Sequence, residues 1–256
     1  MVKIGFFIFC ICIGSQLTGQ PSVYSVANVH AHNDYEHNTP FTDAYALQLG
    51  SIEADVLLIR DSLFVAHSVK QISQQVLLQN AYLDKLAAGV QANHGYAYSD
   101  PSRVLQLLID IKTDSLQTLN VVMQQIAQYP LLINNPTIHF VITGNQPDPK
   151  NFDTYPGWLL FDGKINNPVH IEQRKRIALF SDNFATYSHW KGEGPIPDQD
   201  LSVIRSAIQK AHALHKPFRF WGVPDNPHVW KIMTELGVDY INTDHISAAA
   251  AFVSGR

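Results

Sequence analysis

The feature that most constrains the fold of this chain is a repeated alternation between short apolar runs and longer segments of helical periodicity. Apolar runs of about four to eight residues bounded by turn residues are typical of buried strands, and the stretches between them are typical of covering helices. The predicted strands are 27–30, 52–58, 104–111, 138–142, 158–161, 176–180, 218–222 and 240–242. The predicted helices include 41–49, 115–129, 198–215, 226–236 and 247–253. This alternation predicts an α/β fold, a single (β/α)8 TIM barrel of about 250 residues.

Composition supports a folded domain and argues against several partners. Hydrophobic residues make up 46% of the 256 residues and the formal net charge is −4, so the chain can bury enough apolar surface to fold. Its 18 Lys and Arg residues are scattered, which argues against a nucleic-acid partner.

A doubly wound open sheet is the rival fold, but the glycine-rich first turn usual there is missing. The glutamine-rich segment 71–91 is expected to be a surface excursion.

The N-terminal segment has the composition of a secretory signal. Lys3 precedes the apolar stretch Ile4 to Gly14, and small and polar residues follow as far as Gln20. Eleven apolar residues are too few for a membrane span of about 20, so we expect residues 1–20 to be a cleaved signal peptide. The mature protein, residues 21–256, would then be exported, secreted or periplasmic, without a stable transmembrane segment. Both cysteines lie in the segment that would be removed, which excludes a zinc-thiolate site.

Acidic side chains gather at the carboxyl ends of the second and third predicted strands. Residues i and i+2 of a strand share a face, so Glu53 and Asp55 point to the same side, as do Asp110 and Lys112. Three carboxylates in one low-dielectric barrel mouth repel each other unless a cation compensates them. Oxygen donors suit a hard cation, so the pattern predicts one divalent ion, Mg²⁺ or Ca²⁺. A buried ion-pair network that only positions the strands is the alternative.

Histidines flank this cluster. His30 ends the first predicted strand and His67 follows the short run 63–66, so both are expected near the mouth of the barrel. Imidazole titrates near neutrality, and one histidine can therefore remove a proton while the other donates one to a leaving oxygen. The pattern predicts His30 and His67 as an acid–base pair.

Four blocks resemble the phospholipase C-like phosphodiesterase superfamily, which includes glycerophosphodiester phosphodiesterases and sphingomyelinase D-type enzymes. These blocks are residues 30–35 (His-Ala-His-Asn-Asp-Tyr), 51–56 with His67, 108–113 (Leu-Ile-Asp-Ile-Lys-Thr), and 220–223 with 236–244. The resemblance implies a TIM barrel in which Glu53, Asp55 and Asp110 hold Mg²⁺ or Ca²⁺. It also implies catalysis by His30 and His67, with Lys112 neutralising a phosphate oxygen.

The resemblance has one departure that bears on the substrate. Glycerophosphodiesterases have His-Arg-Gly where this chain has His30-Ala31-His32, so no arginine is available there to grip the phosphate. His32, Asn33 and Trp221 are further substrate-binding candidates. The turns 143–145, 161–163 and 181–183 could line the mouth or be ordinary turns, and any assistance from Asp34, Glu36 or Asp162 stays open.

The sequence therefore predicts an exported, metal-dependent phosphoric diester hydrolase acting on a small phosphodiester or lipid substrate. Two alternatives from other classes remain. An amidohydrolase-type metal hydrolase would use the His30-x-His32 motif, but it needs more histidines at later strand ends. A non-catalytic secreted binding barrel would share the fold without the reaction, because fold alone does not prove activity.

Overall fold

A computed structural model describes residues 21–72, 76–167 and 169–255 of this chain, and nine strands of this part form one sheet. The predicted signal peptide, residues 1–20, lies outside the described residues. The strands are β1 (Val29–Ala31), β2 (Ser51–Ile59), β3 (Ser62–Val65), β4 (Leu105–Ile111), β5 (Ile138–Gly144), β6 (Leu159–Gly163), β7 (Ile177–Asn183), β8 (Phe218–Trp221) and β9 (Ile241–Thr243). Their order is β8-β7-β6-β5-β4-β2-β1-β9.

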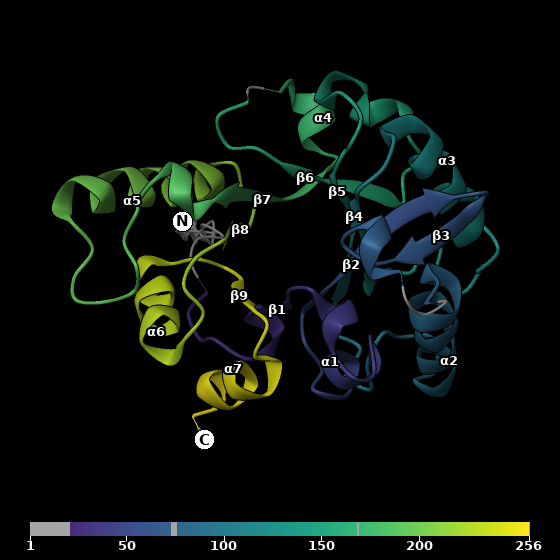
Figure 1. Ribbon diagram of the computed structural model, residues 1–256, viewed down its shortest axis with the longest axis horizontal. Helices are drawn as coiled ribbons and strands as arrows, with labels where there is room; N and C mark the ends of the chain where they lie inside the picture. The colour runs from purple at the N-terminus through teal and green to yellow at the C-terminus, as the bar shows by residue number, and fades with distance from the viewer. Residues whose placement is uncertain (1–20, 73–75, 168, 256) are drawn as a thin grey trace, which may run out of the picture.

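The eight strands of this path pair in parallel and curl into a nearly closed barrel (Figure 1). A bridge between Arg219 and Tyr240 links β8 to the start of the last strand. The predicted (β/α)8 barrel is therefore confirmed. The ninth strand, β3, pairs antiparallel with β2 beyond the barrel rim, and its chain leads directly to His67.

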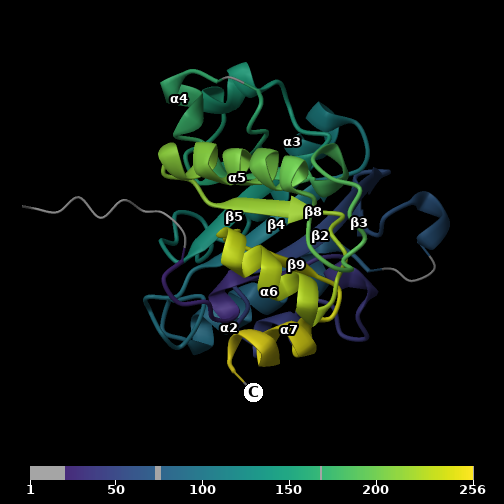
Figure 2. The ribbon, with the colours of Figure 1, turned by 90° about the vertical axis from the view of Figure 1, so that its left-hand side faces the viewer.

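Helices cover the outside of the barrel (Figures 1 and 2). They are α1 (Thr42–Ala46), α2 (Asp84–Ala92), α3 (Ser115–Ile126), α4 (Ile171–Arg174), α5 (Asp198–Ala213), α6 (Pro227–Leu236) and α7 (Ile246–Val253). The expectation that 71–91 is a surface excursion is wrong for its second half. Tyr82, Leu86 and Val90 are spaced at four residues and are all buried, and the glutamine content of the segment masks this helical stripe.

The side-chain alternation of the strands separates an outer core from the barrel interior. On β4, Leu107 and Ile109 point outward and are buried in the large core beneath the helices. Leu108 points inward, where it packs with Val141 and Leu179 in a separate apolar cluster. Asp110 shares the inward face of Leu108 one step nearer the carboxyl end. The barrel therefore presents polar side chains at the mouth where strand ends converge.

Among the described residues, we find no helix whose length and apolar content together would suit a membrane span.

Candidate active site

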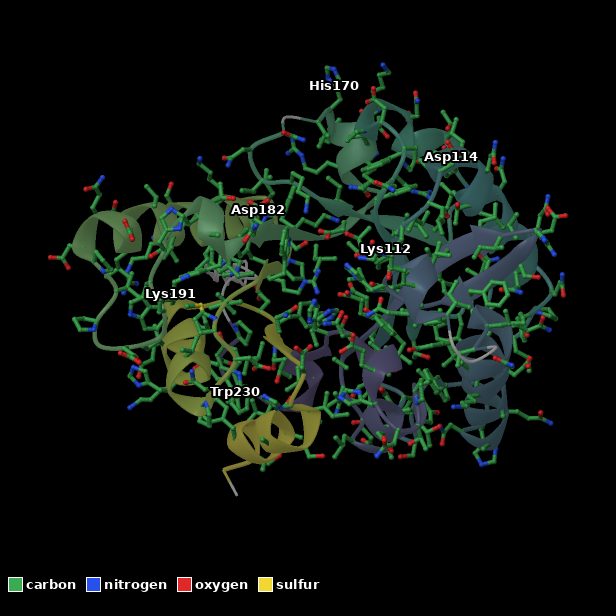
Figure 3. All side chains as sticks on the ribbon, in the orientation of Figure 1. Lys112, Asp114, His170, Asp182, Lys191 and Trp230 are labelled. Carbon is green, nitrogen blue, oxygen red and sulfur yellow. The ribbon has the colours of Figure 1, made fainter. Side chains whose placement is uncertain are left out.

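A cavity of about 700 Å³ opens at the carboxyl end of the barrel strands, within the usual size range of small-molecule sites. Figure 3 shows Lys112 on the side of the strands that faces this central space. The lining comprises His32, Asn33, Tyr35, Glu36, Glu53, His67, Gln71, Asp110, Lys112, Thr143, Gly144, Asn145, Lys164, Arg219 and Trp221. The four predicted substrate-binding residues, Lys112, His32, Asn33 and Trp221, all belong to this lining.

The three predicted metal ligands lie together. One carboxylate oxygen from each of Glu53, Asp55 and Asp110 lies within 4.8 Å of the others. Lys112 Nζ lies 3.1 Å from Asp55 Oδ2 and 2.8 Å from Asp110 Oδ2. The second oxygens, Asp55 Oδ1 and Asp110 Oδ1, are buried and accept no hydrogen bond from the described residues. Buried carboxylate oxygens without donors fit a cation, so the cluster could bind one divalent metal.

The electrostatics of the cluster agree with this fit. Burial and the charge of Asp55 raise the pKa of Asp110 to about 6. Burial and the charge of Glu53 likewise raise the pKa of Asp55. Burial alone would also raise the pKa of Glu53, but the hydrogen bond from His30 and the charge of Arg219 outweigh it and hold that pKa below its usual value. The cluster is therefore short of positive charge.

Gly144 keeps one side of the cluster open. Its φ is +71°, and a Cβ at this position would lie 2.0 Å from Asp110 Oδ1 and 2.6 Å from the carbonyl oxygen of Ile111. Any side chain would therefore collide with the unpartnered oxygen of Asp110. Glycine adopts this positive φ without strain, and its lack of a side chain leaves Asp110 Oδ1 accessible.

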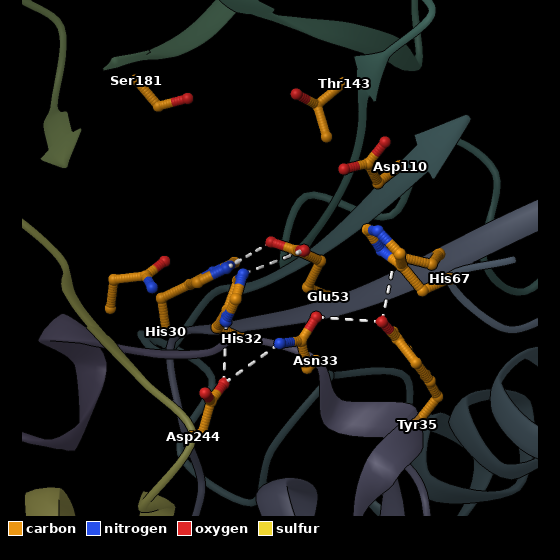
Figure 4. A network of polar contacts seen from close by, with 12 residues as sticks. His30, His32, Asn33, Tyr35, Glu53, His67, Asp110, Thr143, Ser181 and Asp244 are labelled. Carbon is orange, nitrogen blue, oxygen red and sulfur yellow. Dashed lines mark hydrogen bonds and ion pairs between the residues drawn. The ribbon is translucent and has the colours of Figure 1, made fainter. Parts of the chain in front are cut away.

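Two histidines reach the cavity, and each is held by an aspartate. His67 Nδ1 lies 2.9 Å from Asp55 Oδ2. His32 Nδ1 lies 2.7 Å from Asp244 Oδ1, and its Nε2 lies 4.0 Å from Glu53 Oε1. Figure 4 shows His32 and His67 on opposite sides of Glu53. A carboxylate only accepts hydrogen bonds, so each Nδ1 carries the proton and each Nε2 is left for the cavity.

The charge balance at His32 differs from that at a free imidazole. Burial lowers the pKa of His32, but the hydrogen bond to Asp244 and the charge of Glu53 raise it, and the result lies above the usual value. The same hydrogen bond lowers the pKa of Asp244. Asp244 therefore stabilises the protonated form of His32.

His30 lies deeper than His32 and is not part of the cavity lining. It is fully buried. Its Nδ1 lies 2.7 Å from Ser51 Oγ, and its Nε2 contacts both Glu53 Oε2, at 2.8 Å, and Arg219 Nη1. Burial and the charge of Arg219 lower the pKa of His30 to about 3. Both ring nitrogens are engaged, so His30 offers no metal ligand and the amidohydrolase alternative loses its motif.

Three residues left open by the sequence take different places. Asp34 is buried and accepts hydrogen bonds from the Phe41 amide, at 2.6 Å, and the Tyr82 hydroxyl, at 2.9 Å, which is a structural role. Glu36 lines the cavity. Asp162 is buried and accepts from the hydroxyls of Thr143 and Ser181.

Sequence reasoning missed Arg219 and the partner role of Asp244. Arg219 is an ion in the otherwise apolar strand Phe-Arg-Phe-Trp, and this interruption is the signal that could have revealed it. Asp244 follows the last strand, but its pairing with His32 spans 212 positions of the chain. Tyr35 and Lys164 also line the cavity, and so does the turn 143–145, which the sequence left open as a possible part of the mouth.

The fold is a TIM barrel, and comparison with known families finds two phosphodiesterase families whose models match parts of this chain. A model of the AIM6-like phosphodiesterase domain matches residues 22–131. A model of the glycerophosphoryl diester phosphodiesterase family matches residues 217–246. The first segment contains the three carboxylates, and the second contains Arg219 and Asp244. The resemblance to the phospholipase C-like phosphodiesterase superfamily is thus confirmed.

Curated relatives and a solved structure extend this finding. The chain is 27% identical to Altered inheritance of mitochondria protein 6 of Kluyveromyces lactis, over 89% of this chain and 72% of that protein. It is 24% identical to a homolog of that protein in Arthroderma benhamiae, over 88% of this chain and 83% of the relative. The fold is similar to that of a glycerophosphodiester phosphodiesterase from Parabacteroides distasonis, with a TM-score of 0.55 and 15% identity over 90% of this chain and 97% of that one.

The comparisons contradict the predicted localisation. The relatives are named for the inheritance of mitochondria, which does not fit a secreted or periplasmic protein, so the prediction of export is wrong. The prediction failed because an apolar stretch after one lysine indicates only that the segment favours an apolar environment. It does not specify which membrane or machinery the segment meets.

Proposed function

We propose that this protein is a metal-dependent phosphoric diester hydrolase acting on a small phosphodiester of the glycerophosphodiester or phospholipid-headgroup type. One observation carries the proposal. Three clustered carboxylates, two of which have an unpartnered buried oxygen, and two histidines, each held by an aspartate, belong to the same end of one barrel.

Glu53, Asp55 and Asp110 would hold the cation. All three donors are oxygens, which favours Mg²⁺ or Ca²⁺ over zinc. When bound, the ion would stabilise the negative charge that develops on the phosphoryl oxygens. Lys112, which contacts Asp55 and Asp110, would add a fixed positive charge beside the same oxygens.

His32 and His67 are the better-supported acid–base pair. One would remove a proton from the nucleophile, a water or a substrate hydroxyl, and the other would protonate the leaving alcohol. Both line the cavity, and their Nδ1 atoms are held by Asp244 and Asp55, which leaves Nε2 for proton transfer. His30, buried and bonded through both nitrogens, would instead orient Glu53.

Phosphorus NMR against a panel of glycerophosphodiesters and lysophospholipids tests the proposal in the presence of Mg²⁺ or Ca²⁺. We expect a new monoester or cyclic-phosphate resonance with the wild-type protein. The matched control is Asp110→Asn, which keeps the side-chain shape and removes one charge of the cluster. If folded wild-type protein saturated with either ion turns over no member of the panel, the proposal fails.

A further inference from the structure

Arg219 has an unusual position, with a guanidinium group inside the barrel. It comes from β8, is only 3% exposed, and nevertheless contributes to the cavity lining. Burying a guanidinium is costly unless its charge and its donors are satisfied. Its hydrogen-bond partners therefore indicate what the residue does.

Among the residues that the structure describes, acceptors are found for one nitrogen of this group, Nη1. Nη1 lies 3.0 Å from Glu53 Oε2 and 3.1 Å from Asn242 Oδ1, and it also contacts His30 Nε2. An Nη carries two protons, and the oxygens of Glu53 and Asn242 can accept both of them. None of the described residues accepts a hydrogen bond from the buried Nε. No hydrogen bond joins Nη2 to any of the described residues either, so the edge formed by Nε and Nη2 has no partner among them.

Three other arginines can be compared with Arg219, because each also has a buried Nε. Arg103, Arg174 and Arg176 also have a buried Nε without an acceptor. None of these three contributes to the cavity lining, and their Nη2 atoms donate to backbone carbonyls. Among the described arginines, Arg219 alone combines the unpartnered edge with a place at the cavity.

The net charge of the site indicates which kind of ligand the unpartnered Nε–Nη2 edge would bind. Glu53, Asp55 and Asp110 carry three negative charges against the positive charges of Lys112 and Arg219. A divalent cation would turn this deficit into a single net positive charge, which matches a phosphodiester monoanion. A guanidinium edge with two parallel N–H groups fits two oxygens of one phosphoryl group.

We propose that Arg219 binds the non-bridging oxygens of a phosphate group through its Nε–Nη2 edge, while Nη1 stays anchored to Glu53 and Asn242. This inference rests on the proposed function for its substrate, a phosphodiester. It gives the site an oxyanion-binding arginine that comes from β8 rather than from the first strand, where the chain has Ala31.

Titration of the full-length, Mg²⁺-loaded protein with inorganic phosphate tests the role. We expect Arg219→Lys to weaken phosphate binding about 10–100-fold, because one ammonium replaces a two-point, charge-assisted contact. Arg103→Lys, outside the cavity, is the matched control and should change binding less than about twofold. Folded Arg219→Lys protein that binds phosphate as tightly as wild type would overturn the inference.

A merely structural role for Arg219 is separated by Asn242→Ala. This variant removes one anchor of Nη1 but leaves the Nε–Nη2 edge. We expect it to lower the thermal midpoint and to weaken phosphate binding much less than Arg219→Lys does, because the Glu53 anchor remains. Parallel effects of the two variants on both quantities would assign Arg219 to structure alone.

A measurement on the wild-type protein tests the same inference without requiring that a variant folds. In a ¹⁵N spectrum of arginine side chains, one Nε–H resonance should shift when phosphate is added, and no shift would contradict the inference. Phosphate binding is measured without turnover, so the two proposals fail separately. A protein that binds phosphate through Arg219 but hydrolyses no diester loses only the proposed function.

Discussion

At the level where Glu53 faces the barrel interior, its register partner on β4 is Leu108, and the partner of Leu108 on β5 is Val141. The interior therefore changes from charged to apolar within three neighbouring strands. We call the first region the polar sector, defined by His30, Ser51, Glu53, Arg219 and Asn242. The apolar sector is defined by Leu108, Val141 and Leu179.

The two sectors are stabilised by different forces. In the apolar sector, burial of hydrocarbon favours folding directly. In the polar sector, hydrogen bonds and the Glu53–Arg219 ion pair mainly offset the cost of taking charges out of water. A barrel interior needs filling, not charge, for its stability. The polar sector is therefore expected to serve the site, and the apolar sector to serve the fold.

The largest effect is expected from removing the cation or one of its ligands, next to the polar sector. EDTA should abolish phosphodiesterase activity, and Mg²⁺ or Ca²⁺ but not zinc should restore it. Asp110→Asn should also abolish activity while leaving the thermal midpoint unchanged or higher, since it removes a buried charge repelled by Asp55. Stoichiometric zinc bound by histidines in the purified protein would contradict this assignment.

The histidines come next. His32→Ala and His67→Ala should each lower kcat about 10²–10⁴-fold, because acid–base assistance is lost, with little change in the thermal midpoint. The sequence pattern alone ranks His30 above His32, and the cavity ranks them the other way. His170→Ala, on the exposed periphery (Figure 3), is the control. Full kcat in folded His32→Ala protein would return the role to His30.

The apolar sector should respond in the opposite way. Leu108→Ala should cost about 2–5 kcal/mol in the free energy of unfolding, through lost burial and the cavity left behind. The kcat of the folded fraction should stay within about threefold of wild type. Leu116→Ala, at an exposed site of α3, is the matched control for the stability change. Urea denaturation with parallel kinetics measures both, and a loss of kcat larger than the loss of stability would break the comparison.

The smallest effect is expected at His37, beside the polar sector. The contact of its Nδ1 with Asp34 Oδ1, an ion pair at 3.5 Å, raises the pKa of His37 to about 9. Because the folded-state pKa exceeds the usual 6.5, this contribution is fully present below pH 6.5 and is lost as the pH rises through 9. His37 is partly exposed, so the effect should not exceed about 1 kcal/mol. His37→Gln should reduce the wild-type difference in unfolding free energy between pH 6 and pH 10 by this contribution, and an unchanged difference would exclude His37.

Local signals predicted the strands and the carboxylates, because each depends on a few adjacent residues. The run Leu-Leu-Ile-Asp-Ile-Lys marks both β4 and the inward face of Asp110. Depth along the barrel axis was not predictable. His30 and His32 share one strand face, and only the closed barrel separates the buried histidine from the one at the cavity. The role of Arg219, within the predicted strand 218–222, was not predictable either, since its acceptors, Glu53 and Asn242, come from other strands.

The closure between β8 and β9 has a dynamic consequence. Among the described residues, one backbone bridge, Arg219 to Tyr240, and the side-chain hydrogen bond from Arg219 to Asn242 link this boundary, whereas β4 and β5 pair at seven positions. Amide protons along this boundary should exchange with solvent first, before those of β4. Such breathing would separate Arg219 from Glu53 but leave the three carboxylates, all on β2 and β4, together. Opening of this boundary would therefore weaken the proposed binding of an anion at Arg219, while the carboxylates proposed to hold the cation keep their positions.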